Sequence, residues 1–220
     1  MNTILKFIFS NLNAIILVIW FLFLIIVTIR FFRPNWVKNI SYKKLLLIVL
    51  GFHIVYGIFI TWGQYYVWAK GSGVTKVLLH LPLSSQVPFP HFLEWSRFIF
   101  ENNIGYFSYY VLGRFWSSIF ILFFTSLILY FIFKIWKSYR GGFSEEGPLL
   151  LFILMLVSGW PGIIVSVALG FIFATLFFIF YFVKNMKDKN PPKVIFIEGF
   201  FILSTLIALL FTKVIMFYML

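Results

Sequence analysis

Long apolar runs separated by short polar stretches dominate the pattern along the chain. Six runs are predicted to be helices: residues 12 to 30, 45 to 66, 115 to 134, 147 to 160, 162 to 183 and 195 to 216. A membrane crossing takes about 20 apolar residues, and ten-residue segments of alternating hydrophobicity, typical of a β-barrel, are absent. The pattern therefore predicts an all-α, polytopic membrane protein with about six transmembrane helices. Residues 1–220 are expected to form a single integral membrane domain.

Composition supports this prediction. Hydrophobic residues make up 62% of the chain and charged residues 11%, against roughly 45–50% and 25% in soluble domains. The formal net charge of +12 comes mostly from Lys and Arg in short loops between the apolar runs, where cations set orientation and meet anionic headgroups. The lipid bilayer is thus the expected partner, and nucleic acid is not. Cysteine is absent, which excludes thiol catalysis and thiolate metal sites, and we expect no cofactor and no metal site.

The loop charges predict the orientation of the chain in a plasma or inner membrane. Twelve Lys and Arg residues follow the first, third and fifth runs, and six are spread over the opposite side. Because cytoplasmic loops are enriched in Lys and Arg, we expect both termini outside and the basic loops in the cytoplasm. The first run is longer than a signal-peptide core and lacks a small-residue cleavage site, so it is expected to be a retained helix.

One long outer loop, at about 67–114, separates the second and third runs. Its Trp and Tyr residues suggest a segment on the outer membrane surface, with an amphipathic helix at about 90 to 101. Beside it, Trp62 and Gln64 in "WGQYYVW" and the intramembrane His53 are candidate ligand-binding residues. A simpler interpretation makes the aromatic residues an interfacial belt and His53 a neutral side chain bonded to a neighbouring helix.

A second candidate site surrounds "GGFSEEG", residues 141 to 147, directly before the short fourth run. We expect Ser144 to cap that helix, with Glu145 and Glu146 in its first turn, where carboxylates favour the helix dipole. Glu198 lies near the start of the last run, where it could pair with Lys193. "GWPG", 159 to 162, predicts a tight turn to the next helix.

The order of a basic loop, Gly-Gly, acid, short apolar helix, Gly-Trp-Pro-Gly, long apolar helix, basic loop and final helix resembles the type IV prepilin peptidases, the GxGD aspartyl proteases of membranes. In this sequence the GxGD motif falls on Gly142, Phe143, Ser144 and Glu145, and the Pro-Asn of the family falls on Pro34 and Asn35. The resemblance is weak over residues 20 to 37, better over 115 to 212, and implies a prepilin-peptidase-like core. It also implies a membrane protein or a type IV pilin-like leader peptide as partner.

The catalytic positions of that family are not retained. Aspartyl chemistry needs two carboxyl groups sharing one proton, but the first falls on Val27 or Thr28 and the second on the longer Glu145. The leading hypothesis is therefore a pseudoenzyme that binds a membrane partner or leader peptide without cleaving it. One alternative is an active, diverged peptidase using Glu145, Glu146 and Glu198. Another is a small-molecule binding or transport component built around His53, Trp62 and Gln64.

Overall fold

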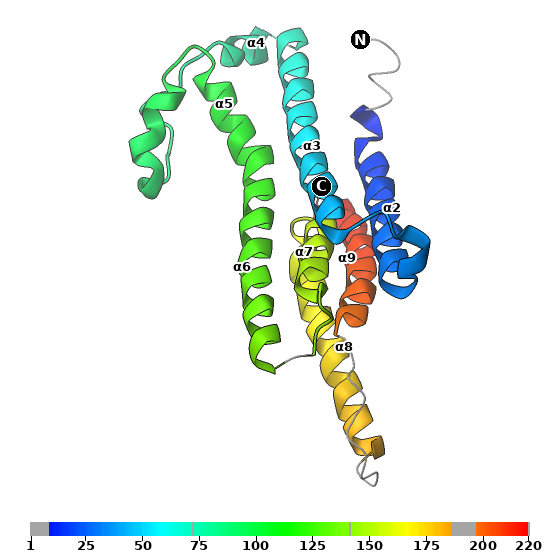
Figure 1. Cartoon of the computed structure of the whole chain (residues 1–220). Coiled ribbons are helices and arrows are strands. Elements are labelled where there is room, and N and C mark those ends of the chain that lie inside the picture. The colour runs from blue at the N-terminus through cyan, green and yellow to red at the C-terminus, as the bar shows by residue number, and fades with distance from the viewer. Residues whose placement is uncertain (1–8, 72, 141, 186–196, 220) are drawn as a thin grey trace. The chain divides into compact units, whose positions relative to one another are not determined.

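The computed structural model describes residues 9–71, 73–140, 142–185 and 197–219, and no β-strand occurs in these ranges. The helices, shown in Figure 1, are α2 (Leu12–Phe32), η1 (Pro34–Val37), α3 (Tyr42–Lys70), α4 (Gly73–Leu79), η2 (His91–Phe100), α5 (Gly105–Val111), η3 (Leu112–Trp116), α6 (Ser117–Arg140), α7 (Gly147–Ser158), α8 (Gly162–Asn185) and α9 (Glu198–Met219). The prediction of an all-α chain is confirmed.

Among the residues that the structure describes, four helical segments are long and apolar enough to cross a membrane: Leu12–Phe32, Tyr42–Lys70, Gly105–Tyr139 and Gly162–Lys184. Two shorter apolar segments are Gly147–Ser158 and Glu198–Phe211. Each of the four long helices exceeds the roughly 20 residues that a bilayer requires. Four helices of this length and composition indicate a membrane-spanning protein.

The chain divides into two compact units. The first consists of residues 1–51 and 121–220, and the second of residues 52–120. The first unit contains α2, α7, α8 and α9, and it holds the glutamates Glu145, Glu146 and Glu198. The second contains α3 from residue 52 onward together with α4, η2, α5, η3 and the first turn of α6, and the rest of α6 belongs to the first unit.

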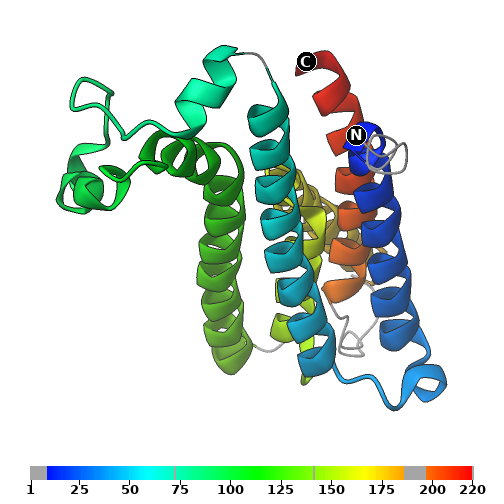
Figure 2. The same ribbon diagram turned by 90° about the horizontal axis from the view of Figure 1, so that it is seen from above.

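Helix α7 is the buried centre of the first unit. All its residues except Leu149 are buried, and it packs against α2, α8 and α9. A helix that is apolar on every side is suited to such an enclosed position. Helix α2 lies beside α9 in both Figure 1 and Figure 2, and α9 also runs along α8.

Helices α8 and α9 approach closely through a small residue and a polar pair. The ring of Phe201 fills the space beside Gly170, where an added Cβ would lie 2.8 Å from the ring carbon Cδ1. The hydroxyl groups of Ser166 and Thr205 are 2.9 Å apart, and both residues are fully buried. Small residues and interhelical hydroxyl contacts commonly stabilise helix association in lipid, because burial of apolar surface does not favour association there.

The observed start of α7 differs from the predicted start, whereas its end agrees with the prediction. The helix begins at Gly147, so Ser144 is not its N-cap and Glu145 and Glu146 precede its first turn. The physical reason is that Ser144 forms a turn of its own: its carbonyl accepts the Gly147 N–H, and its N–H is used elsewhere. At the other end Gly159 has φ +68, a left-handed conformation that suits glycine, and the turn to α8 is as predicted.

Much of the segment predicted to be an outer loop, about 67–114, is helical and belongs to the second unit. Helix α3 continues to Lys70, and helix resumes at Gly105 and runs through a π-helical turn, η3, into α6. Between these points lie α4 and η2, and η2 is a 3-10 helix at the position where a short amphipathic helix was predicted, about 90 to 101. The core of the unit consists of Trp68, Leu79, Phe107 and Val111.

Candidate functional site

The site is built around Glu198, the first residue of α9. Its side chain is fully buried, and its Oε1 accepts a hydrogen bond of 2.6 Å from the backbone N–H of Ser144. The preceding residue, Ile197, donates its N–H to the carbonyl of Gly142 at 3.4 Å. The start of α9 therefore holds the loop of residues 142–146, which leads into α7.

Two glycines make this close approach possible. Gly142 has φ +84, a conformation that costs other residues roughly 1–2 kcal/mol. Gly147 lies against the carboxylate, and a Cβ added there would collide with Glu198 Oε1. The glycines of "GGFSEEG" at 142 and 147 therefore have structural causes that do not depend on a catalytic motif.

The second carboxylate oxygen has a different environment. Glu198 Oε2 is buried and has no hydrogen-bond partner among the residues that the structure describes. The buried Tyr42 lies within range of the charges of Arg30, Glu146 and Glu198, and the Arg30 guanidinium is 5.6 Å from the centre of its ring. The ends of α2, α3 and α9 thus bring a cation, a phenol and a carboxylate into one polar cluster.

Arg30 and Tyr42 were not singled out from the sequence. Arg30 donates from Nη1 to the carbonyl of Pro34 at 3.2 Å, and its Nε is buried without a partner in the described part of the chain. The available signal was a Tyr placed between basic residues at the start of a membrane helix, in "NISYKK". That pattern is also typical of an interfacial anchor, so it does not by itself indicate a site.

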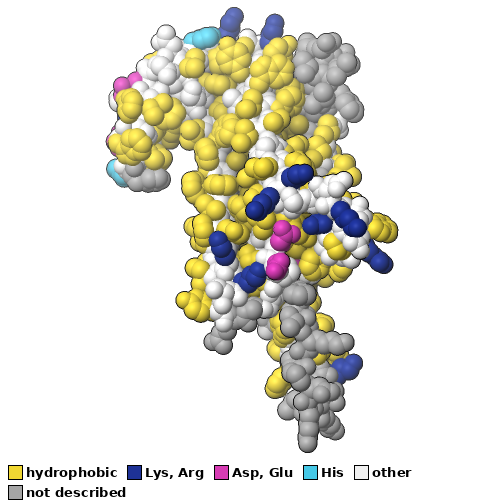
Figure 3. Space-filling view, in the orientation of Figure 1, with side chains coloured by type: hydrophobic (Ala, Val, Ile, Leu, Met, Phe, Trp, Pro, Cys, Tyr) yellow, Lys and Arg dark blue, Asp and Glu magenta, His cyan; other side chains and the backbone are white. Residues whose placement is uncertain are grey.

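Glu145 and Glu146 lie on the surface, unlike Glu198. Both side chains are exposed, and Lys137 Nζ donates to the backbone carbonyl of Glu145 rather than to its carboxylate. On the face shown in Figure 3, acidic side chains lie among those of Lys and Arg. Lys193, the expected partner of Glu198, lies outside the described residues.

The positions that resemble the first catalytic aspartate offer no acid. Val27 is fully buried, and the Thr28 hydroxyl donates back to the Leu24 carbonyl at 2.7 Å within its own helix. Helix α2 nevertheless packs on α7 and α9, and Phe31 approaches Gly199. Across the described ranges, no hydrogen bond joins two carboxyl groups, so the geometry of a shared-proton dyad is not assembled there.

The ligand-binding candidates of the second unit occupy different environments. Trp62 is exposed and lines an open apolar groove of about 310 Å³ together with Ile58, Thr61, Tyr65, Phe107 and Trp116. His53 is buried and Gln64 is half-buried, and neither contributes to this lining. Within the groove Trp116 Nε1 donates to Thr61 Oγ1, which itself donates to the Gly57 carbonyl, so these two polar groups already have partners.

Metal binding receives no support in the part of the chain that the structure describes, where no group of three or more His, Asp or Glu residues could hold an ion. The hydrogen bonds of Glu198 and Ile197 fix the loop of residues 142–146 on α9. Comparisons with protein-family models, with curated proteins and with solved structures find no match to this chain.

Proposed function

We propose that this chain is a membrane-embedded binding protein with a prepilin-peptidase-like core, which holds a partner segment at the 142–146 loop without cleaving it. The observation that carries the proposal is the hydrogen bond from the Ser144 N–H to Glu198. This bond gives the buried Glu198 side chain a structural role, and Glu145 and Glu146 lie on the surface. Aspartyl proteolysis would instead need two carboxyl groups facing one water.

The short helix α7 supports the architectural part of the proposal. Its 12 residues reach about 18 Å at 1.5 Å per residue, less than the roughly 30 Å of a bilayer core. Enclosure by α2, α8 and α9 allows a half-length helix to end inside the protein. With α7 and α9 as the fourth and sixth spans, the proposed topology has six helices, both termini outside, and the 142–146 loop in the cytoplasm of a plasma or inner membrane.

A partner of suitable chemistry is a membrane protein or a type IV pilin-like leader peptide, whose charged end would reach the exposed Glu145 and Glu146. A photo-crosslinking residue at position 146, in the purified protein reconstituted with such a leader peptide, tests this. The same residue at position 184, exposed at the end of α8, is the control. We expect crosslinking from 146 above that from 184, and equal yields would contradict the proposal.

A second candidate function is small-molecule binding or transport, and the open apolar groove beside Trp62 favours it. Its lining is mostly aromatic and aliphatic, and the Trp116 indole N–H already donates to the Thr61 hydroxyl, so an uncharged apolar ligand would fit best. Binding of an environment-sensitive apolar dye should fall in Trp62→Ala and persist in Trp36→Ala, which alters an exposed Trp of the first unit. Equal binding by both variants would remove this candidate.

A further inference from the structure

Helix η2 exposes an apolar face on the surface of the second unit. The relative exposures of Trp95, Phe98 and Ile99 are 73%, 66% and 51%, whereas Ser96 and Phe100 on the same helix are buried. Residues three apart lie one above the other in a 3-10 helix, so Trp95 and Phe98 share a face. The face of the helix that carries Trp95 and Phe98 is therefore apolar and exposed.

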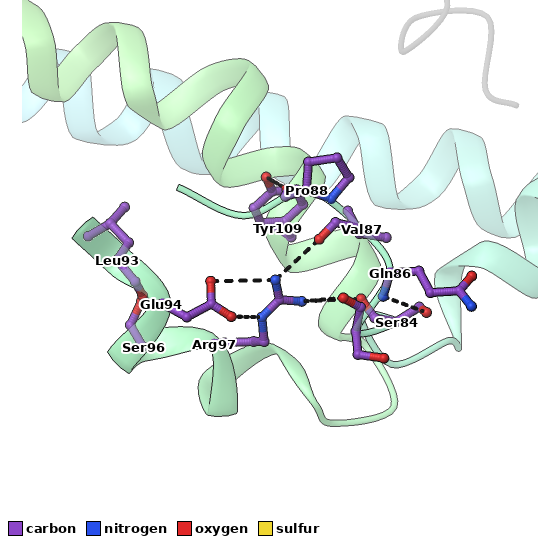
Figure 4. A network of polar contacts seen from close by, with 10 residues as sticks. Ser84, Gln86, Val87, Pro88, Leu93, Glu94, Ser96, Arg97 and Tyr109 are labelled. Carbon is purple, nitrogen blue, oxygen red and sulfur yellow. Dashed lines mark hydrogen bonds and ion pairs between the residues drawn. The ribbon is translucent and has the colours of Figure 1, made fainter. Parts of the chain in front are cut away.

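Arg97 fixes this helix on the segment that precedes it, as Figure 4 shows. Its guanidinium donates to the Glu94 carboxylate and to the carbonyls of Ser84 and Val87, the last two at 3.3 and 3.2 Å. The same group lies 5.0 Å from the centre of the Phe89 ring. Because its donors are directed at acceptors of its own segment, Arg97 orders the segment and holds Trp95 and Phe98 outward.

The ordered segment is in turn attached to α5. The Tyr109 hydroxyl donates to the Pro88 carbonyl at 2.9 Å, and its ring stacks on Phe89 at 5.3 Å. The Tyr106 N–H donates to the Leu81 carbonyl at 3.0 Å. Figure 1 shows the segment after α4 folded back beside α5, in agreement with the contacts between η2 and α5. The level of η2 relative to a membrane therefore follows from that of α5.

Charged residues along the continuous helix Gly105–Tyr139 indicate the depth of α5 in the membrane. Arg114 and Lys134 bracket an uncharged stretch of about 19 residues, 115 to 133. Nineteen residues reach about 28 Å, close to the thickness of a hydrocarbon core. Helix α5 ends at Val111, three residues before Arg114 and outside the uncharged stretch. It therefore lies at the headgroup level of the leaflet that Arg114 marks.

We propose that η2 is an interfacial anchor whose Trp95, Phe98 and Ile99 enter the leaflet on the Arg114 side of the membrane. The occupant is a lipid surface, because the segment lies between two membrane-spanning helices and is fixed at headgroup depth, where Trp is preferred. Exposed Lys70, Lys76 and Arg114 of the same unit complement anionic headgroups. The inference does not depend on the proposed function of the other unit.

The absence of cysteine makes a direct test possible, because each introduced cysteine can be labelled alone. Spin labels at positions 95 and 98 of the full chain, in vesicles of phosphatidylethanolamine and phosphatidylglycerol, would be compared with labels at 101 and 124. Glu101 is an exposed charged residue and Phe124 an exposed apolar residue in the middle of the 115 to 133 stretch. Accessibility to oxygen and to a water-soluble nickel complex reports the depth of each label.

We expect labels at 95 and 98 to be protected from nickel and accessible to oxygen, with depths between those at 101 and 124. Nickel accessibility equal to that at 101 would overturn the anchor. Protection from both reagents would also overturn it, since a protein, such as a second copy of the chain, would then cover the face.

Arg97→Lys provides a second measurement that leaves the labelled positions unchanged. The substitution keeps the charge but loses the planar fork that reaches several acceptors at once, so labels at 95 and 98 should become shallower and more mobile. Arg114→Lys, at an exposed position, is the matched control and should leave both depths unchanged. Unaltered depth in Arg97→Lys would show that the Arg97 contacts do not orient the anchor.

Discussion

The carboxylate of Glu198 and the backbone N–H of Ser144 are joined by a hydrogen bond of 2.6 Å although the residues are 54 positions apart in the chain. The bond is formed by a fully buried acid at the first residue of α9 and ties that helix to the entrance of α7. Removing the acceptor of a buried backbone N–H leaves that donor unsatisfied, which is costly. Glu198, a candidate acid in the alternative of a diverged peptidase that uses glutamates, is thus first of all a structural link.

Removing this link should destabilise the first unit. Glu198→Ala leaves the Ser144 N–H without its acceptor, and we expect a loss of about 1–3 kcal/mol in the free energy of unfolding. Glu198→Gln retains an amide oxygen that can accept the same bond, so its loss should be smaller. Thermal unfolding in detergent micelles measures both. Glu101→Ala, at an exposed position, is the control and should stay within about 0.5 kcal/mol.

Gly147 should tolerate no side chain. In Gly147→Ala the new Cβ meets the Glu198 carboxylate, which is itself held by Ser144, and overpacking of this kind costs about 1–3 kcal/mol. Gly51→Ala is a matched control in a helix, because nothing lies within 4 Å of a Cβ at that position. A lower unfolding midpoint is expected for the first variant only, and equal midpoints would show that the loop moves aside freely.

Gly142 should be sensitive to substitution for a different reason. A Cβ added at Gly142 would have its nearest neighbour at 3.8 Å, so there is space for it. The φ angle of +84 is unfavourable for alanine, and the cost of Gly142→Ala is therefore conformational. We expect a loss of about 1–2 kcal/mol, and a smaller loss in Gly142→Asn because Asn visits this region more readily. A steric cause would reverse the order, since Asn is the larger side chain, and the unfolding midpoints of the two variants decide between them.

The hydroxyl pair between α8 and α9 should contribute modestly. A double-mutant cycle of Ser166→Ala and Thr205→Val removes the 2.9 Å contact one partner at a time. Hydrogen bonds between membrane helices average about 0.6 kcal/mol in such cycles, and we expect a coupling of that size. Additive effects of the two substitutions would indicate that the pair makes no net contribution.

The sequence pattern was sufficient for features that depend on local residues. The apolar run between "GGFSEEG" and "GWPG" predicted a short helix, and α7 ends within two residues of the expected boundary, because Gly159 and Pro161 stop a helix locally. The predicted cap at Ser144 was wrong, since its N–H bonds to a residue far along the chain. Local propensity contains no information about such a partner.

The same limit explains what was missed in the second unit. The expected loop at 67–114 contains ordered helices because Arg97 and Tyr109 bind carbonyls 10 to 21 residues away, and these acceptors are backbone groups that no side-chain pattern displays. The amphipathic pattern around Trp95 was visible and predicted a helix there. Arg30 and Tyr42 could not be assigned to the site, because their proximity to Glu198 arises from the packing of α2 and α9.

Incubation of the reconstituted protein with a type IV prepilin-like substrate tests the central claim most directly. Wild type, Glu145→Gln and Glu198→Gln would be compared for release of the leader peptide, with substrate alone as the control. The account predicts intact substrate in every sample, because Glu198 is engaged by Ser144 and Val27 provides no second acid. Cleavage by wild type that is lost in Glu145→Gln and Glu198→Gln would contradict it and establish an active peptidase that uses glutamates.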